Sequence, residues 1–471
     1  MVELGIKKES FFGVEDILIG DRSSGISKAI FCILCFVPVF STVIFGAVDN
    51  MTWVVISVFW AAIILLWLTE SWKGTGFLLN PSVLLIPLIG LLLLGLIQLL
   101  PLGNGGDGLN IPVVNSLSLE PYATRFFVLR LVVYIFFFAA CLTFINTEKR
   151  LKRIVLLVIS FGSLMAFFGI LQRLANPDGI YGLRGTPQAI PFGPFVNQHH
   201  FAAFMQMTGG LAFGLLFGKD TKRDKKILLA IAVLVMGVAA VLTGSRGGLL
   251  GFISVLGFVT VVSLSFSRWS DDKSEGVSQG KGRLSIILAG AALMVVIFGA
   301  VLFLGGNESL FRGLGIANAD ADISSGRTHF WGIALRIFLD HPIIGAGFDA
   351  FGVAFTKYDT GSGLFRVEQA HNEYLQTLAD AGIAGLTCIV GFIYLLFRKG
   401  FATVKGVAGG FRKDATIGAL AGCCGVMVHS FFDFPLRTPS NAFFFLLLCA
   451  IATVPVMISR KHSTRRRRSA T

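Results

Sequence analysis

The chain has 471 residues, of which 54% are hydrophobic and 14% are charged, and its mean hydropathy is +0.76. This composition excludes a soluble globular protein of ordinary type and indicates a multi-pass membrane protein. The formal net charge of +13 does not indicate a nucleic-acid partner, because the Lys and Arg residues cluster in connectors between apolar runs.

About twelve apolar runs, each of about 17 to 22 residues, have the length that a helix needs to cross a bilayer. They lie at roughly 29–48, 52–69, 81–101, 126–145, 153–172, 200–217, 227–243, 247–266, 285–304, 376–397, 416–431 and 440–458. The run 416–431 is the shortest, and its Gly422 and Gly425 favour close helix packing over exposure to lipid. The sequence thus predicts an all-α integral membrane protein of about 12 transmembrane helices, surrounded by membrane lipids.

The distribution of basic residues predicts the orientation of the chain. Alternate connectors carry clusters of Lys and Arg, which the positive-inside rule places in the cytoplasm together with both termini. The predicted segments are a cytoplasmic N-terminal segment (1–28), spans one to nine (29–305), an outer loop (306–375), spans ten to twelve (376–458) and a basic cytoplasmic tail (459–471). The first segment lacks the apolar core of a signal peptide, so we expect no cleavage.

Several polar residues lie on the predicted outer side of the first six spans. Arg130, at the outer end of the fourth run, either faces protein, water or a lipid phosphate or snorkels to the interface. The next outer loop contains Arg184, Asn197, His199 and His200. A catalytic metal site needs three or four converging ligands at suitable spacing, which this loop does not have. The loop is therefore expected to form a polar surface that contacts sugar or phosphate.

A short connector, 243–248, joins the seventh and eighth runs and contains Ser245, Arg246 and Gly247. It combines a guanidinium, small residues that let a ligand approach the backbone, and the free N–H groups of a helix start. This combination predicts a receptor for the phosphate of a lipid. The alternative is that Arg246 only snorkels and that the glycines form a tight turn.

The outer loop 306–375 contains an amphipathic helix that is expected to lie on a surface. Ser324-Ser325 are expected to supply its N-cap, and Pro342 to end it after about four turns. Arg327 lies in the first turn, one turn before Trp331, where its charge opposes the helix dipole. An anionic ligand would remove that conflict.

The end of the same loop brings further polar residues to the outer face. Arg366 continues the cationic surface, and His371-Asn372 precede an apolar helix, which places an imidazole at a membrane boundary. The residues that follow form a polar stripe at helical spacing, which we expect to face the protein interior. With Gln369, which lies just before His371, they are Glu373, Gln376 and Asp380. The last outer connector adds His429, Asp433 and Arg437 to this side.

Three motifs together resemble the region shared by the O-antigen ligase and O-antigen polymerase superfamily of bacterial envelope glycosyltransferases. They are Gly326-Arg327-x-x-x-Trp331, His341-Pro342-x-x-Gly345-x-Gly347, and His371-Asn372-x-x-Leu375 followed by Gly382 and Gly385. The turn 243–248 is similar to that family's arginine turn, so the motifs cover about 243–390. The resemblance implies a GT-C-like fold, an active site on the periplasmic face of the bacterial inner membrane, and a reaction without nucleotide sugar, metal or other cofactor.

The resemblance also implies roles for individual residues. The donor would be a glycan on undecaprenyl diphosphate, held by Arg246 and Arg327, which would stabilise the charge that develops on the diphosphate. His371 would accept or orient the proton of the acceptor hydroxyl. Residues expected to contact the substrates are Ser245, Gly247, Arg130, Arg184, Asn197, His199, His200, Trp331, Asn372 and Arg366.

The motifs do not identify the acceptor. A ligase would use lipid A–core, a polymerase would extend a repeat-unit polymer, and other relatives glycosylate protein. A transporter or flippase of lipid-linked sugars is a different reading, but it predicts internal repeats and interrupted helices with polar residues near the midplane. The sequence shows no repeat, and its polar residues gather on one face. A structural protein of the envelope would not need His371.

Overall fold

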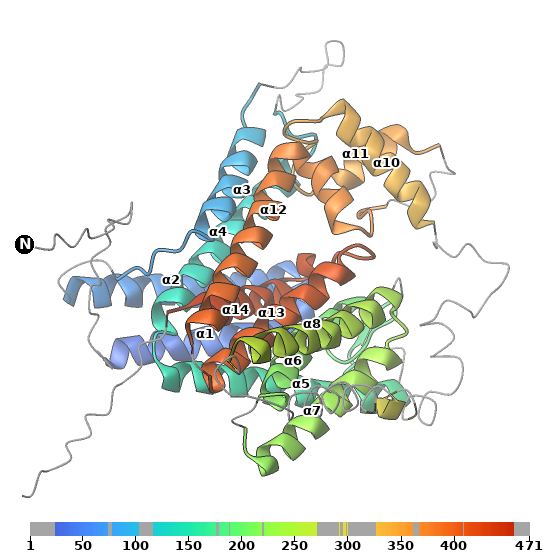
Figure 1. The fold of residues 1–471 in the computed structure, drawn as a ribbon. Helices are drawn as coiled ribbons and strands as arrows, with labels where there is room; N and C mark the ends of the chain where they lie inside the picture. Colours follow the sequence, from blue (N-terminus) through green and yellow to red (C-terminus); the bar gives the residue numbers. More distant parts are fainter. Residues whose placement is uncertain are drawn as a thin grey trace, which may run out of the picture.

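The computed structural model describes residues 24–73, 78–102, 116–175, 179–187, 189–218, 221–270, 292, 295–297, 299, 326–360, 367–407 and 409–455. The regular structure of these residues is helical except for a short antiparallel pair of strands, β1 (Gly179–Ile180) and β2 (Arg184–Gly185). Figure 1 shows the helices gathered in one bundle, with α10 and α11 to one side of it.

The described residues up to 270 form eight α-helices. They are α1 (Gly25–Val43), α2 (Asn50–Lys73), α3 (Leu85–Gln98), α4 (Pro121–Phe144), α5 (Glu148–Ala175), α6 (Gln198–Leu216), α7 (Arg223–Leu242) and α8 (Arg246–Ser270), with a 3-10 turn η1 (Phe45–Ala47) after α1. The second half supplies α10 (Arg327–Asp340), α11 (Phe351–Tyr358), α12 (Glu373–Gly406), α13 (Phe411–His429), the 3-10 turn η2 (Pro435–Arg437) and α14 (Pro439–Thr453). A helix occupies every predicted span except 285–304, which lies almost entirely outside the described residues.

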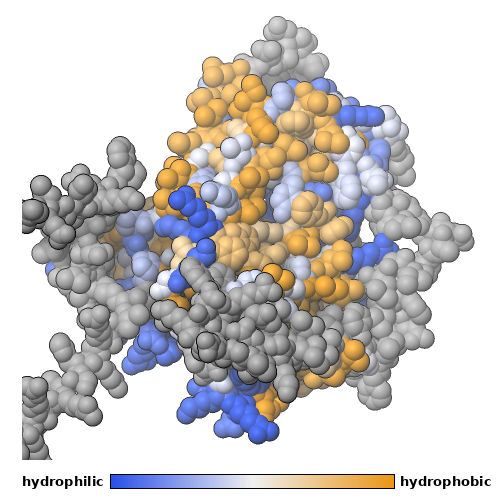
Figure 2. All heavy atoms as spheres, in the orientation of Figure 1, coloured by the Kyte–Doolittle hydropathy of each residue, from blue (hydrophilic) through white to orange (hydrophobic). Residues whose placement is uncertain are grey.

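Length and composition support a membrane location. Within the described part of the chain, seven helices are long and apolar enough to cross a bilayer: α1, α2, α4, α5, α7, α8 and α12. Large apolar side chains on these helices and on α3 are exposed, and Figure 2 shows hydrophobic residues over the surface that α3 and α12 form. The protein is therefore an all-α, multi-pass membrane protein, while twelve crossings stay a prediction.

The centre of the bundle is the contact between α6 and α13. A methyl group on Gly210 of α6 would lie 2.6 Å from the backbone nitrogen of Gly422, so the two helices touch through their backbones. One on Gly425 would lie 3.0 Å from the carbonyl oxygen of Gly251 in α8. The glycines of the run 416–431 thus serve helix packing, as the sequence predicted.

The amphipathic helix that the sequence predicted after Ser324-Ser325 is α10. Gly326 occupies its N-cap position in a left-handed conformation (φ 79°), and the two serines proposed for the cap lie outside the described residues. The helix ends at Asp340, before Pro342, as expected. Its inner face packs with α11 around Ile333, Ile337 and Phe355.

A turn after α10 fits into a break in α12. Gly382 departs from helical geometry (φ 61°, ψ −162°), and the amide of Ile383 donates to the carbonyl oxygen of Pro342 at 2.9 Å. Gly345 has a positive φ of 73°, and a methyl group there would lie 2.2 Å from the nitrogen of Ala381. Glycine is required at Gly345 because two stretches of backbone meet with no room for a side chain.

Candidate functional site

The proposed catalytic histidine lies beside a buried carboxylate. Nδ1 of His371 is 3.3 Å from Oδ1 of Asp433, in the connector between α13 and α14. Nδ1 of His199, at the start of α6, is 3.9 Å from the other oxygen of the same carboxylate. Asp433 is 1% exposed, whereas the side chains of His371 and His199 are 29% and 25% exposed. One buried acid therefore lies against two imidazoles whose side chains remain partly accessible.

Local backbone contacts fix His371 in this place. Its φ is +52°, a conformation that side chains rarely adopt. Asn372 caps α12, since its side-chain oxygen accepts from the amides of Tyr374 and Leu375, both at 3.1 Å. The amide of Glu373 donates to the carbonyl oxygen of Ser430 at 2.9 Å. The start of α12 is thus bound to the connector that carries Asp433.

The charge state of Asp433 follows from its neighbours. Burial alone would raise the pKa of this carboxyl, but the adjacent imidazoles of His371, His199 and His200 hold the pKa well below its ordinary value. Asp433 is therefore ionised at neutral pH and can stabilise positive charge on His371.

The arginine turn lies against the same connector. A methyl group on Gly247 would lie 2.7 Å from Cδ2 of His429 and 2.9 Å from Cβ of Phe432, the residue before Asp433. Ser245 is buried, and its hydroxyl oxygen accepts from the amide of Gly248 at 3.0 Å, which caps α8. Arg246 is half-buried at the first position of that helix. The turn therefore brings Arg246 and a helix N-terminus to the connector that carries Asp433.

The start of α10 approaches from another side. Phe330, in the first turn of α10, stacks on the ring of His371 with centroids 6.3 Å apart. Arg327 opens the helix and is close enough for its charge to act on His199 and His429. The three residues to which the sequence assigned catalytic roles are thus placed around one connector, although they come from α8, α10 and the start of α12.

This arrangement suits an anionic ligand next to a second group that has a proton to lose. Two half-buried arginines and two helix starts offer positive potential, and a histidine supported by a carboxylate offers a base. Within the described ranges, no group of three or more His, Cys, Asp and Glu side chains has an arrangement that could hold a metal ion.

Other predicted substrate residues have different surroundings. Arg184 forms an ion pair with Asp49, with Nη2 at 3.0 Å from Oδ1, and lies over Phe45. Asn197 caps α6 by accepting from the amide of His199 at 2.8 Å. Trp331 follows Phe330 on α10, with its indole nitrogen buried. Arg366 lies outside the described residues.

Arg130 and His200 lie on a neighbouring cavity instead. Arg130 packs over the ring of Trp53, with 5.3 Å to the ring centroid. His200 is 9% exposed, and its Nδ1 contacts the hydroxyl of Thr438. Both residues line the cavity together with Arg437. The structure therefore separates the predicted substrate residues into two adjacent groups.

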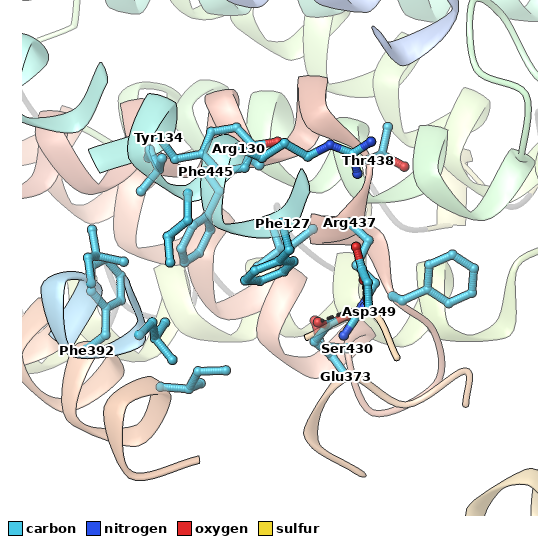
Figure 3. Close-up of a pocket in the computed structure, with 18 of the residues that line it drawn as sticks. Phe127, Arg130, Tyr134, Asp349, Glu373, Phe392, Ser430, Arg437, Thr438 and Phe445 are labelled. Atoms are coloured by element: carbon cyan, nitrogen blue, oxygen red, sulfur yellow. Dashed lines mark hydrogen bonds and ion pairs between the residues drawn. The ribbon is translucent and has the colours of Figure 1, made fainter. Parts of the chain in front are cut away.

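Arg437 forms a second ionic cluster that the sequence placed on the outer face without a role. Its guanidinium is 13% exposed and contacts three carboxylates: Glu373 at 3.2 Å, Asp380 at 3.0 Å, and Asp349. Figure 3 shows Arg437, Asp349 and Glu373 together at one end of the cavity. Asp380 and Gln376 are fully buried, which confirms that the polar stripe of α12 faces the interior.

A signal for Asp433 was present in the sequence. An acid placed among three phenylalanines, in Phe431-Phe432-Asp433-Phe434, is costly near a membrane unless it has a partner. The sequence alone could not identify His371 as that partner, because His371 is far from Asp433 along the chain.

Part of the chain matches a known family. Residues 231–390 match the family model described as O-antigen ligase. The matched stretch contains Arg246, Arg327 and His371 and ends before Asp433 and Arg437. No curated protein matches the chain.

Proposed function

We propose that this membrane protein, whose residues 231–390 match the O-antigen ligase family model, transfers a glycan from undecaprenyl diphosphate to an acceptor hydroxyl. The reaction would take place on the periplasmic face of the bacterial inner membrane, with lipid A–core as the acceptor. The observation that most supports this proposal is the approach of the arginine turn, the start of α10 and His371 to the connector that holds Asp433.

The proposed step needs no group beyond the two substrates and the side chains. The bond between the anomeric carbon of the sugar and the diphosphate oxygen breaks, and its electron pair leaves with the lipid diphosphate. A bond forms between the acceptor hydroxyl oxygen and the same carbon. The hydroxyl proton passes to His371. Arg246 and Arg327 hold the diphosphate and stabilise the charge that develops on it.

Asp433 makes His371 suitable for this role. A proton on Nδ1, which lies 3.3 Å from Asp433, leaves Nε2 unprotonated and able to accept from the hydroxyl. When His371 becomes an imidazolium, the buried carboxylate stabilises its charge. The positive φ of His371 suggests that the backbone is held in a strained conformation to aim this ring.

The break in α12 bears on the transporter alternative. Transporters use interrupted helices to expose backbone groups to an ion or substrate near the midplane. Here the turn at Gly345 fills the break, with the amide of Ala346 donating to Ala379 at 2.8 Å and that of Gly347 to Asp380 at 3.0 Å. The break thus serves to dock the turn, which gives no support to transport.

The orientation of the chain can be tested by cysteine labelling with a reagent that does not cross membranes. We expect Ser362→Cys to react in intact spheroplasts and Ser463→Cys to react only after lysis, because the loop 306–375 is assigned to the periplasm and the tail to the cytoplasm. Each variant is compared with the unmodified chain, which has seven cysteines. Protection of Ser362→Cys together with labelling of Ser463→Cys in intact cells would reverse the orientation.

The activity itself can be tested with purified protein. A lipid-diphosphate glycan is incubated with lipid A–core, with a repeat-unit glycan and with an acceptor protein, and mass spectrometry identifies the acceptor that gains the glycan. We expect lipid A–core to gain mass, and we expect turnover to persist in excess EDTA. A gain by the repeat-unit glycan alone would make the protein a polymerase. Loss of turnover in EDTA with recovery on adding a divalent ion would show that a metal takes part.

A further inference from the structure

A cavity of about 410 Å³ lies next to the Asp433 cluster, among α3, α4, α12 and α14. This volume is within the range of about 300–1,000 Å³ that small-ligand sites occupy. Figure 3 shows that its two ends differ: Tyr134, Phe392 and Phe445 lie towards one end, and Glu373 and Arg437 towards the other. The cavity is therefore amphipathic, with an apolar part and a polar part.

Four of the side chains that line this cavity have a buried polar atom without a partner in the described part of the chain. Nε2 of His200, Oε2 of Glu373, Oε1 of Gln369 and Nε of Arg130 are all buried, and none has a hydrogen-bond partner within the described residues. His200 is only 9% exposed. A buried polar group without a partner costs about 1–3 kcal/mol, and four such atoms around one space indicate a ligand that satisfies them.

The charges at the polar end argue against a phosphate. Arg437 is surrounded by the three carboxyl groups of Asp349, Glu373 and Asp380, so its positive charge is already neutralised within the cluster. A second anion would meet like charges there, and Arg130 is the one further cation among the lining residues. A carboxylate oxygen, an amide oxygen, an imidazole nitrogen and a guanidinium are, by contrast, suitable partners for hydroxyl groups.

The geometry points to a binding site for the uncharged, hydroxyl-rich head of an amphipathic acceptor, a glycolipid whose sugar lies at Glu373, Gln369 and His200 and whose hydrocarbon chain lies along α3, α4 and α12. This inference rests on the proposed function. It assigns the acceptor to a place separate from Arg246 and Arg327, which are proposed to hold the donor. The ring of Phe434 lines the cavity and lies 5.0 Å from the ring of His371 and 5.1 Å from that of His200. The side chain of Phe434 thus lies between a sugar in the cavity and His371, the proposed base.

The test uses radiolabelled octyl glucoside below its micellar concentration and the full chain in lipid nanodiscs, without donor. We expect saturable binding of octyl glucoside and binding of octyl phosphate that is weaker by about tenfold or more, since the phosphate meets the carboxylates. Gln369→Leu should weaken glucoside binding about tenfold, because it removes one hydrogen-bond acceptor. Ala442→Phe, which fills the cavity from α14, should abolish it.

The matched control is Gln172→Leu, because Gln172 lies in α5 and donates to the carbonyl oxygen of Gly179, away from the cavity. It should bind octyl glucoside like the unmodified chain, and thermal unfolding in the same nanodiscs reports whether each variant is folded. If Ala442→Phe fails to fold, Gln369→Leu still decides: unchanged glucoside binding in that variant would overturn the inference.

Two further results would overturn it. One is tighter binding of octyl phosphate than of octyl glucoside. The other is displacement of octyl glucoside by geranyl diphosphate together with loss of geranyl diphosphate binding in Ala442→Phe, which would make the cavity the site of the donor lipid. Glucoside binding without glycan transfer to any acceptor would refute the proposed function and retain the hydroxyl-binding cavity, whereas transfer without glucoside binding would refute this inference alone.

Discussion

Two ionic clusters lie four residues apart in the same connector, and they are built in opposite ways. At Asp433, one buried carboxylate lies between imidazoles whose side chains are 25% and 29% exposed. At Arg437, one guanidinium that is 13% exposed is surrounded by three carboxylates. The first cluster leaves its histidines accessible to a substrate, while the second uses every nitrogen of its central group within the protein.

The difference indicates that the Asp433 cluster serves the reaction, whereas the Arg437 cluster serves the fold. Arg437 joins three segments, since Asp349 precedes α11, Glu373 and Asp380 belong to α12, and Arg437 itself lies in η2. Its contacts hold these segments together as the wall of the cavity. Asp433 contacts side chains that can gain or lose a proton without changing the fold. Substitutions at the two positions should therefore fail in different ways.

The largest effect is expected for Arg437→Met, which leaves three carboxylates without their cation. Removing one partner of a buried ion pair costs about 3–5 kcal/mol, so we expect a large fall in the melting temperature or no folded protein. Thermal unfolding in detergent measures this. Arg336→Met is the control, because Arg336 is exposed on α10. A melting temperature of Arg437→Met equal to that of the control would show that the cluster does not hold the fold.

Asp433→Asn should instead fold and lose activity. The amide keeps the size of the carboxyl but cannot stabilise an imidazolium, so we expect turnover to fall by about 10²–10⁴-fold while thermal unfolding changes little. Single-turnover transfer with saturating donor measures the loss. Full activity in this variant would remove Asp433 from the proposed mechanism and leave His371 without an orienting group.

A smaller effect distinguishes the two possible roles of Asn372, which the sequence assigned to substrate binding and the structure shows as the cap of α12. Asn372→Ala should lower stability by about 1 kcal/mol, and Asn372→Ser should retain most of it, because serine also caps helices. Unfolding curves and KM for the acceptor measure the two roles. A raised KM with unchanged stability would indicate a substrate contact.

The sequence predicted the helices well and the contacts between them poorly. Each described apolar run became a helix because the length of a bilayer and the absence of charge restrict what such a run can do. Helical spacing also predicted that Gln376 and Asp380 face the protein interior. Their partner was not predicted, because Arg437 lies in a separate segment and only the tertiary fold brings its guanidinium to Asp380.

The candidate site shows the same limit. Arg246, Arg327 and His371 could be selected because each lies in a short motif of recognisable chemistry. The role of Asp433 depends on a contact with His371, which local pattern does not report. The left-handed conformation of Gly326 at the N-cap of α10 was also not predicted, because a glycine alone does not specify its φ.

The most direct measurement compares His371→Ala with Arg246→Ala and Arg327→Ala in a donor-binding titration alongside single-turnover transfer. His371→Ala should leave donor affinity nearly unchanged and cut turnover by about 10²–10⁴-fold, the usual contribution of a positioned base. Either arginine variant should weaken donor binding and lower turnover together, by about 10²–10³-fold in turnover. His329→Ala, on the exposed side of α10, is the control and should resemble the unmodified chain in both. If His371→Ala abolished donor binding while the protein stayed folded, the histidine would be a phosphate ligand, and the division between donor-binding arginines and an acceptor-activating histidine would be wrong.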